Sequence, residues 1–299
     1  MDRMTVRSAG HDLHVVTAGD ARHPTVLFLH GYPDSHRVWR EAMEALSEGY
    51  RVVSYDMRGV ADSAPPAPSR EYRLERLAAD VDAVLDAVCG HGTRAHLVGH
   101  DWGSTLAWHY VADPERARRV LSLTSISGPH LGITTRWIRD GFTGLRPRQM
   151  ATVAKQLLKS SYVLFFSAWP LAELFWWVGG APAWRFSLRR AGVPHGDPML
   201  DEPRERVLSL TLRPLALYRR NLWRSNPPPP EGSITVPVLL LLATADPFVS
   251  EAVFDDLERY ATRVTRRRVN ASHWAQRSNP EELLALLRDF LRAQEETRA

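Results

Sequence analysis

The hydrophobic positions in the first half of the chain alternate between two patterns. Short apolar runs such as 25–31 and 95–100 are typical of strands buried on both faces of a parallel sheet. Between such runs, segments like 72–88 place apolar residues at steps of three and four, which predicts amphipathic helices. The alternation predicts an α/β fold with a mostly parallel sheet. Further strands are expected at 51–59 and 120–127, after an opening hairpin over 5–19.

The same alternation returns near the end of the chain. Strands are predicted at 236–246 and 262–272, with a helix at 250–261 between them. A closing helix follows, for which we expect Asn279 as the N-cap and Pro280 as the first helical residue. The end of the chain therefore extends the α/β pattern of its beginning.

The region between these two parts has a different pattern. Residues 130–232 show helical spacing and many aromatic residues but no convincing strand, and the Pro-rich stretch 225–233 closes them. We therefore predict a helical cap inserted between two strands of the sheet. The predicted division is a core domain of residues 1–129 and 233–299 and a cap domain of residues 130–232.

The most apolar part of the predicted cap is the stretch 162–180. It contains Pro170 and Glu173 and ends in two glycines, which disfavours a membrane-spanning helix. We expect it to pack within the cap and to form the wall of an apolar pocket.

Composition narrows the class of protein. With 44% hydrophobic and 24% charged residues, the 299-residue chain has the profile of a soluble globular protein. The net charge is +4, but no arginine cluster is interleaved with aromatics as in a nucleic-acid-binding module. The N-terminus lacks the apolar core of a signal peptide, and the single cysteine fits a reducing compartment. We expect a cytoplasmic monomer or homodimer that binds no nucleic acid and has no firm membrane association.

The stretch Gly99-His100-Asp101-Trp102-Gly103 has the spacing of the nucleophile elbow G-x-S-x-G, with aspartate in place of serine. Such a turn lifts one side chain above the sheet, close to a helix N-terminus that favours a negative charge. An ionised carboxylate there is a competent nucleophile toward an sp³ carbon that carries a leaving group, and the product is a covalent ester. The alternative is that Asp101 only caps the following helix.

An ester intermediate needs a base to hydrolyse it and an acid to orient that base. Asp246 ends a predicted strand, and His273 lies in the loop before the last helix. The order nucleophile, acid, base is that of the α/β-hydrolases. The other position at which some relatives carry the acid, after the strand that follows the elbow, reads Ser125 to His130 and contains no carboxylate. We therefore predict the catalytic set Asp101, Asp246 and His273.

The segment from Phe28 to Pro33 supplies a sharp turn after a buried strand. Gly31 permits the turn and Pro33 fixes it, with a cis peptide bond expected before the proline. This would aim the backbone N–H of Tyr32 into the site, where it could form an oxyanion hole together with the N–H of Trp102. We expect His30, Pro33 and Trp102 to contact substrate, and a purely structural turn is the alternative.

On these motifs the sequence resembles the epoxide hydrolases of the α/β-hydrolase superfamily, over nearly the whole chain. The hydrolase part of some bacterial proteins in which a short-chain dehydrogenase follows is especially similar. The resemblance implies an α/β-hydrolase fold, an eight-stranded sheet with helices on both sides and an inserted cap. It also implies hydrolysis of an apolar epoxide by water to a vicinal diol. No ligand cluster or phosphate-binding loop points to a metal or an organic cofactor. The motifs that carry the resemblance are HGYP, YDMRG, GHDWGS, TADPFV and NASHW.

The resemblance also implies two cap tyrosines that donate hydrogen bonds to the epoxide oxygen. Tyr162 and Tyr218 are the candidates, and the Tyr-Arg-x-Asn context of Tyr218 is similar to that of the family. Ring opening leaves charge on oxygen, which a phenol can stabilise or protonate. The alternative for each tyrosine is aromatic packing inside the cap.

Two other functions stay open. Haloalkane dehalogenases share the aspartate nucleophile and need N–H donors for the departing halide. Tyr32 stands where some of them carry asparagine, but cap tryptophans such as Trp169, Trp176 and Trp177 could serve. The second alternative is a ligand-binding protein of the same fold that has lost its chemistry.

Overall fold

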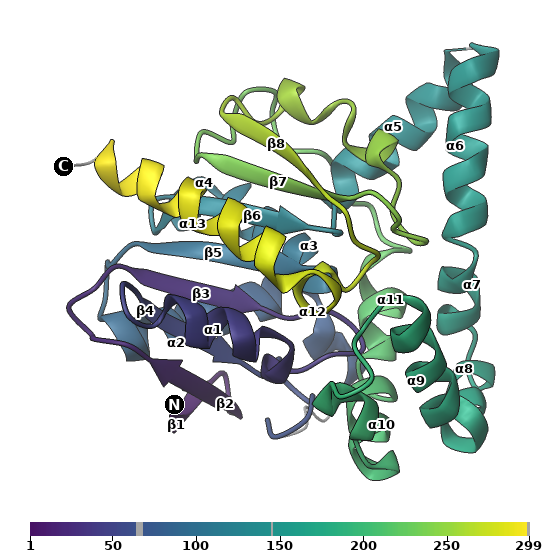
Figure 1. The fold of residues 1–299 in the computed structure, drawn as a ribbon. Coiled ribbons are helices and arrows are strands. Elements are labelled where there is room, and N and C mark those ends of the chain that lie inside the picture. Colours follow the sequence, from purple (N-terminus) through teal and green to yellow (C-terminus); the bar gives the residue numbers. More distant parts are fainter. Residues whose placement is uncertain (64–67, 145, 298–299) are drawn as a thin grey trace.

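The computed structural model describes residues 1–63, 68–144 and 146–297. Its centre is an eight-stranded sheet in the order β1-β2-β4-β3-β5-β6-β7-β8 (Figure 1). The first two strands form the predicted hairpin, β2 also pairs antiparallel with β4, and every later pairing is parallel. The predicted α/β-hydrolase sheet is therefore confirmed. The strands are β1 (Asp2–Ser8), β2 (His11–Ala18), β3 (Thr25–Leu29), β4 (Arg51–Tyr55), β5 (Ala95–His100), β6 (Val120–Ile126), β7 (Val238–Ala243) and β8 (Val264–Val269).

The central strands are buried on both faces, which explains their near-continuous apolar runs. Every residue of β3, β5, β6 and β7 is buried. One pair of helices, α1 and α13, packs together on one face, and α2 and α3 pack together on the other (Figure 1). The helices of the core are α1 (Arg40–Leu46), α2 (Leu74–Cys89), α3 (Trp102–Val111), α4 (Pro114–Ala117), α12 (Ala275–Ser278) and α13 (Pro280–Glu296).

The chain between β6 and β7 forms the helical cap, which stands along one side of the sheet (Figure 1). Among its described residues, 130–144 and 146–232, there is no strand. None of the helices in the described part of the chain is both long enough and apolar enough to cross a membrane. The cap helices are α5 (Leu131–Thr143), α6 (Pro147–Lys159), α7 (Tyr162–Ser167), α8 (Leu171–Phe175), α9 (Ala181–Arg190), α10 (Arg204–Thr211) and α11 (Leu215–Asn221), with a π-helical turn over Trp176–Gly180.

One local prediction about the end of the chain is wrong, and a second is confirmed in position but not in its hydrogen bonds. The predicted helix 250–261 is instead two short 3₁₀ turns, Glu251–Phe254 and Leu257–Arg259. Tertiary contacts compete with the helix here, because the carbonyl of Phe254, which would accept the amide of Glu258 in an α-helix, accepts a hydrogen bond from the guanidinium group of Arg266.

The second difference concerns the start of α13. Asn279 occupies the N-cap position before Pro280, as expected, but its side chain makes no capping bond. Its amide group instead donates to the carbonyl of Asn270 and to Glu282. The asparagine therefore ties the helix start to the loop after β8.

Candidate active site

The predicted elbow is a strained turn between β5 and α3. Asp101 has φ = 52° and ψ = −121°, a backbone conformation that costs a non-glycine residue about 1–3 kcal/mol. The two glycines beside it allow close backbone approach: a Cβ atom on Gly99 would lie 2.6 Å from the carbonyl oxygen of Gly103, and one on Gly103 would lie 2.1 Å from that of Leu29. The side chain of Asp101 makes no capping bond to α3. The alternative role as a helix cap therefore does not hold.

The three residues predicted as a catalytic set meet in the structure. The Nδ1 atom of His273 lies 3.1 Å from Oδ2 of Asp246, and its Nε2 atom lies 3.7 Å from Oδ2 of Asp101. The other oxygen of Asp246 accepts hydrogen bonds from the backbone amides of Phe248 and Val249. Backbone amides therefore hold one oxygen of Asp246, and its other oxygen orients His273 so that Nδ1 points to Asp246 and Nε2 to Asp101.

Electrostatics keep the acid of this set ionised. Burial alone would raise the pKa of Asp246, but the charge and hydrogen bond of His273 and the hydrogen bond from the amide of Phe248 lower it to about 2. Asp246 is therefore a carboxylate at neutral pH, and it accepts a hydrogen bond from the Nδ1–H group of His273.

His273 and Asp101 each shift the pKa of the other through the electric field between them. Burial opposes the charged form of His273, but Asp246, Asp101 and Asp34 together raise its pKa above the ordinary value. Burial raises the pKa of Asp101, and the positive field of His273 and hydrogen bonds from backbone amides oppose that rise. A change of charge on Asp101 therefore changes the basicity of His273.

The turn after β3 places a backbone hydrogen-bond donor beside Asp101. The peptide bond between Tyr32 and Pro33 is cis, as predicted. The N–H of Tyr32 donates a 2.8 Å hydrogen bond to Oδ1 of Asp101, and the amide of Trp102 also favours the ionised carboxylate. The two oxygens of Asp101 thus have different surroundings: Oδ1 accepts the amide hydrogen bond of Tyr32 and Oδ2 faces His273.

A cavity of about 260 Å³ lies between the sheet and the cap, directly over Asp101. Its wall is mostly aromatic. Apart from tyrosines, Asp101 and His273 are the only titratable side chains among the described lining residues. The cavity is lined by Tyr32, Pro33, Asp101, Tyr162, Phe165, Phe166, Phe175, Trp176, Ala183, Trp184, Ser187, Tyr218, Phe248, His273 and Trp274.

Both predicted cap tyrosines line this cavity. Tyr162 comes from α7 and Tyr218 from α11, and their rings are 6.2 Å apart at 83°. Burial and the nearby charge of Asp101 raise the pKa of both phenols well above the ordinary value. Each tyrosine therefore keeps its proton and is a hydrogen-bond donor opposite the carboxylate.

The structure does not support direct substrate contact by His30 or by the Trp102 side chain. His30 is fully buried behind the cavity wall, where its Nδ1 lies 2.8 Å from the carbonyl oxygen of Gly31 and its Nε2 accepts a 2.9 Å bond from the amide of Met57. It therefore braces the turn that carries the Tyr32 amide. The ring of Trp102 packs 5.1 Å from that of Tyr218 and is absent from the described lining.

Three residues behind His273 were not predicted from the sequence. The Nε2 atom of His100 lies 2.9 Å from the carbonyl oxygen of His273, and its Nδ1 lies 3.6 Å from the buried carboxylate of Asp34. The indole of Trp274 donates a hydrogen bond to the same carboxylate. These groups position His273. The sequence signal that could have indicated this support is Asp34, an acidic residue directly after the motif HGYP.

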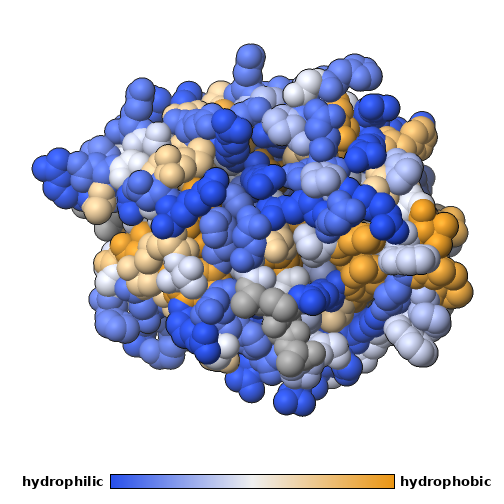
Figure 2. All heavy atoms as spheres, turned by 90° about the horizontal axis from the view of Figure 1, so that it is seen from below, coloured by the Kyte–Doolittle hydropathy of each residue, from blue (hydrophilic) through white to orange (hydrophobic). Residues whose placement is uncertain are grey.

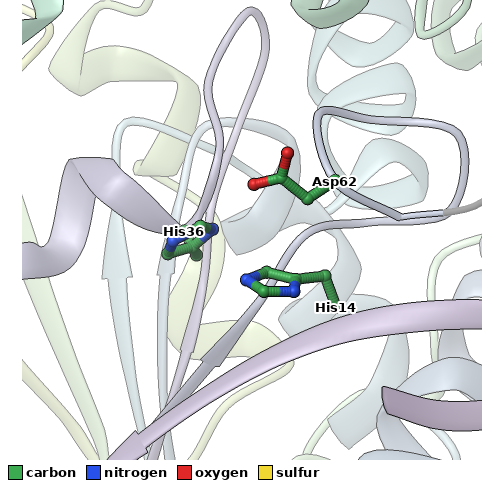
Figure 3. A group of neighbouring side chains, drawn as sticks. All are labelled: His14, His36 and Asp62. Carbon is green, nitrogen blue, oxygen red and sulfur yellow. The ribbon is translucent and has the colours of Figure 1, made fainter. Parts of the chain in front are cut away.

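One group of metal-ligating side chains lies away from the cavity. Potential ligand atoms of His14, His36 and Asp62 all lie within 4.8 Å of one another (Figure 3). However, His36 is hydrogen-bonded to Asp56, and Asp62 is paired with Arg206 of α10. The pair of Asp62 and Arg206 therefore connects the core to the cap, and Asp56 holds His36 within the core.

Comparison with known proteins agrees with this geometry. The family model described as alpha/beta hydrolase fold matches residues 24–174. The chain is 32% identical over 297 residues to the probable oxidoreductase EphD of Mycobacterium tuberculosis, a match that covers 97% of this chain and 49% of that protein. The chain thus spans about half the length of this relative. It is also 30% identical over 304 residues to epoxide hydrolase 4 of Mus musculus, with 98% of this chain and 79% of that protein covered.

A solved structure shows the same fold. The crystal structure of an epoxide hydrolase from Bacillus megaterium in complex with an inhibitor is similar with a TM-score of 0.80 at 24% identity, and the match covers 97% of this chain and 100% of that one. At that identity the likeness concerns the fold alone, whereas the mouse protein is similar enough in sequence, over most of its length, to show the family. The chain therefore belongs to the epoxide hydrolase family of the α/β-hydrolase fold.

Proposed function

We propose that the protein hydrolyses an apolar epoxide to a vicinal diol through a covalent ester on Asp101. One observation supports this most strongly. Asp101 presents Oδ2 to an aromatic cavity and to Nε2 of His273, while Oδ1 accepts the amide hydrogen bond of Tyr32. A carboxylate with one free and one fixed oxygen is suited to attack with the first and to carry charge on the second.

The first step opens the ring. Oδ2 of Asp101 attacks a ring carbon, the carbon–oxygen bond on the far side breaks, and its electron pair moves to the epoxide oxygen. Tyr162 or Tyr218 protonates this oxygen, because both phenols face the cavity opposite the carboxylate. The mostly apolar wall favours a substrate with apolar substituents.

The second step hydrolyses the ester. Alkylation removes the negative charge of Asp101, which is one of the groups that raise the pKa of His273. The histidine then reverts more readily to the neutral form, and its Nε2 takes a proton from water, which attacks the ester carbonyl. Oδ1 becomes the oxyanion and the amides of Tyr32 and Trp102 stabilise it. The alkyl oxygen leaves as the second hydroxyl of the diol and takes its proton from His273. Asp101 is left as a carboxylic acid, and its proton returns to the phenolate that protonated the epoxide oxygen, so that both groups regain their starting states.

Replacing the cap phenols separates this proposal from simple aromatic packing. The change Tyr218→Phe keeps the ring and removes the acid, so we expect ring opening to slow by about 10²-fold or more, and Tyr162→Phe to act in the same direction. The measurement is the single-turnover rate of ester formation with styrene oxide. Phe166→Tyr is a matched control at the cavity wall. A rate unchanged by both phenylalanine variants would remove the tyrosines from the mechanism.

A pair of product assays distinguishes the proposed function from its alternatives. We expect diol from styrene oxide and no halide from a panel of bromoalkanes. Of the three cap tryptophans considered as halide donors, Trp176 lines the cavity, whereas Trp169 and Trp177 are exposed at the surface. Halide release without diol would identify a dehalogenase, and neither product from folded protein would indicate a binding protein.

A further inference from the structure

The outer face of the cap carries a large apolar surface. Of the fifteen exposed large apolar residues in the described part of the chain, ten lie between residues 164 and 223, and Figure 2 shows hydrophobic side chains gathered at this edge of the molecule. A concentration of this size marks an interaction surface. The members of this apolar cap patch are Leu164, Phe165, Trp169, Leu171, Leu174, Phe175, Trp177, Val178, Phe186 and Trp223.

The patch is continuous, because the elements that carry it pack against one another. Helix α7 contacts α8 and α11, and the π-helical turn contacts α8 and α9. The rings of Phe165 and Phe175 are 5.4 Å apart, and the indole of Trp223 donates a hydrogen bond to Ser167 at the end of α7. The exposed residues therefore form one face rather than scattered positions.

The same face reaches the active-site cavity. Phe165 and Phe175 both line the cavity and are both more than one-third exposed. An apolar molecule that rests on the patch therefore meets the cavity wall without crossing a polar border at these two residues. The apolar cap patch and the active-site cavity therefore adjoin at Phe165 and Phe175.

Charge is divided unevenly between the two parts of the chain. The cap segment 130–232 contains 15 basic and 7 acidic residues, a net charge of +8. The remaining residues contain 23 basic and 27 acidic residues, a net charge of −4. The apolar patch thus belongs to a strongly basic segment, which attracts an anionic surface. Two copies that met through this face would each bring +8, so their caps would repel.

A basic hollow borders the patch. Trp169 of the patch lines this hollow together with Arg213, Arg219 and Arg220. Arg219 is paired with Glu173, but among the described residues no carboxylate forms an ion pair with Arg213 or Arg220. Arg220 donates hydrogen bonds to the hydroxyl of Ser69, which leaves its charge in place. An exposed indole next to these two positively charged guanidinium groups is typical of a protein surface at the lipid headgroup boundary.

We infer that the apolar cap patch docks reversibly on an anionic lipid bilayer, with the patch inserted among the outer acyl segments and Arg213 and Arg220 at the phosphates. The membrane association that the sequence argued against is therefore proposed here in a peripheral form. Delivery of an apolar epoxide from the bilayer into the cavity would follow, and only that consequence rests on the proposed function.

The test is cosedimentation of the full chain with vesicles, without substrate. We expect binding to vesicles of phosphatidylcholine and phosphatidylglycerol in equal parts, weak binding to phosphatidylcholine alone, and release at about 0.5 M salt. The triple variant Trp169→Ser, Leu174→Ser, Trp177→Ser should lower the partition coefficient at least 10-fold. The pair Arg213→Glu, Arg220→Glu should also lower it about 10-fold or more.

Controls on the core distinguish this surface from a general effect. Met4→Ser and Arg267→Glu alter an exposed apolar and an exposed basic residue of the sheet, and both should bind as the unaltered protein does. The patch variants should also turn over dissolved styrene oxide normally. Unaltered protein that stays in the supernatant with anionic vesicles would overturn the proposal, as would patch variants that still sediment with them. A dimer that the triple variant dissociates, without vesicle binding, would assign the face to a second copy. Because binding is measured without turnover, failure of the proposed function would leave this result intact.

Discussion

The variant His273→Gln is expected to react with one epoxide molecule per chain and to accumulate as the covalent ester formed in the first step. The nucleophile, the amide of Tyr32 and both phenols remain, so Asp101 should still open styrene oxide. Glutamine cannot take a proton from water, so hydrolysis of the ester should slow by about 10²–10⁴-fold. Intact-mass measurement after mixing should show one alkyl group per chain.

The matched control for this prediction is His195→Gln, which alters an exposed histidine of the cap. It should turn over normally and show no added mass. Localising the alkyl group to the peptide that contains Asp101 completes the test. A His273→Gln variant that hydrolyses the epoxide at the original rate, or that never gains mass while folded, would contradict the two-step scheme.

Removing the carboxylate of Asp101 is expected to have the largest effect on activity. Asp101→Gly and Asp101→Ala both delete the nucleophile, and we expect turnover to fall by about 10⁴-fold or more, with no covalent adduct. The two variants should differ in stability. Glycine adopts φ = 52° without the penalty that aspartate incurs, so Asp101→Gly should unfold no more easily than the unaltered protein.

This pairing tests whether strain is held at the reactive residue. The measurements are diol formation and the free energy of unfolding in urea, with Asp201→Ala, at an exposed cap position, as the control. Unaltered turnover in either variant would exclude Asp101 as the nucleophile. A large loss of stability in Asp101→Gly would show instead that the carboxylate supports the fold.

Much of the core was predictable because its strands are buried on both faces, which leaves long apolar runs in the sequence. The meeting of Asp101, Asp246 and His273 was predictable because these residues follow such runs, where parallel strands meet at one edge of the sheet. The segment 250–261 was not, since a side chain of β8 binds one of its backbone carbonyls and no periodicity in the sequence records that contact.

Where the site differs from the prediction, the reason is a hydrogen bond or a tertiary contact that the sequence does not reveal. His30 has the right position in sequence for substrate contact, but both its ring nitrogens are engaged behind the wall. Asp34 and His100 support His273 only because the loop after β3, the end of β5 and the loop after β8 converge there. The apolar stretch 162–180 supplies part of the cavity wall, as predicted, but several of its large apolar residues lie on the outer surface of the cap, which was not predicted.

The most direct test of the covalent route is to follow heavy oxygen from labelled water during a single turnover, with the enzyme in excess over styrene oxide. The account predicts that the label enters the side chain of Asp101 and that the first diol formed is unlabelled, because its new oxygen comes from the aspartate. A labelled first diol with an unlabelled Asp101 would mean that water attacks the epoxide directly, and would contradict the account.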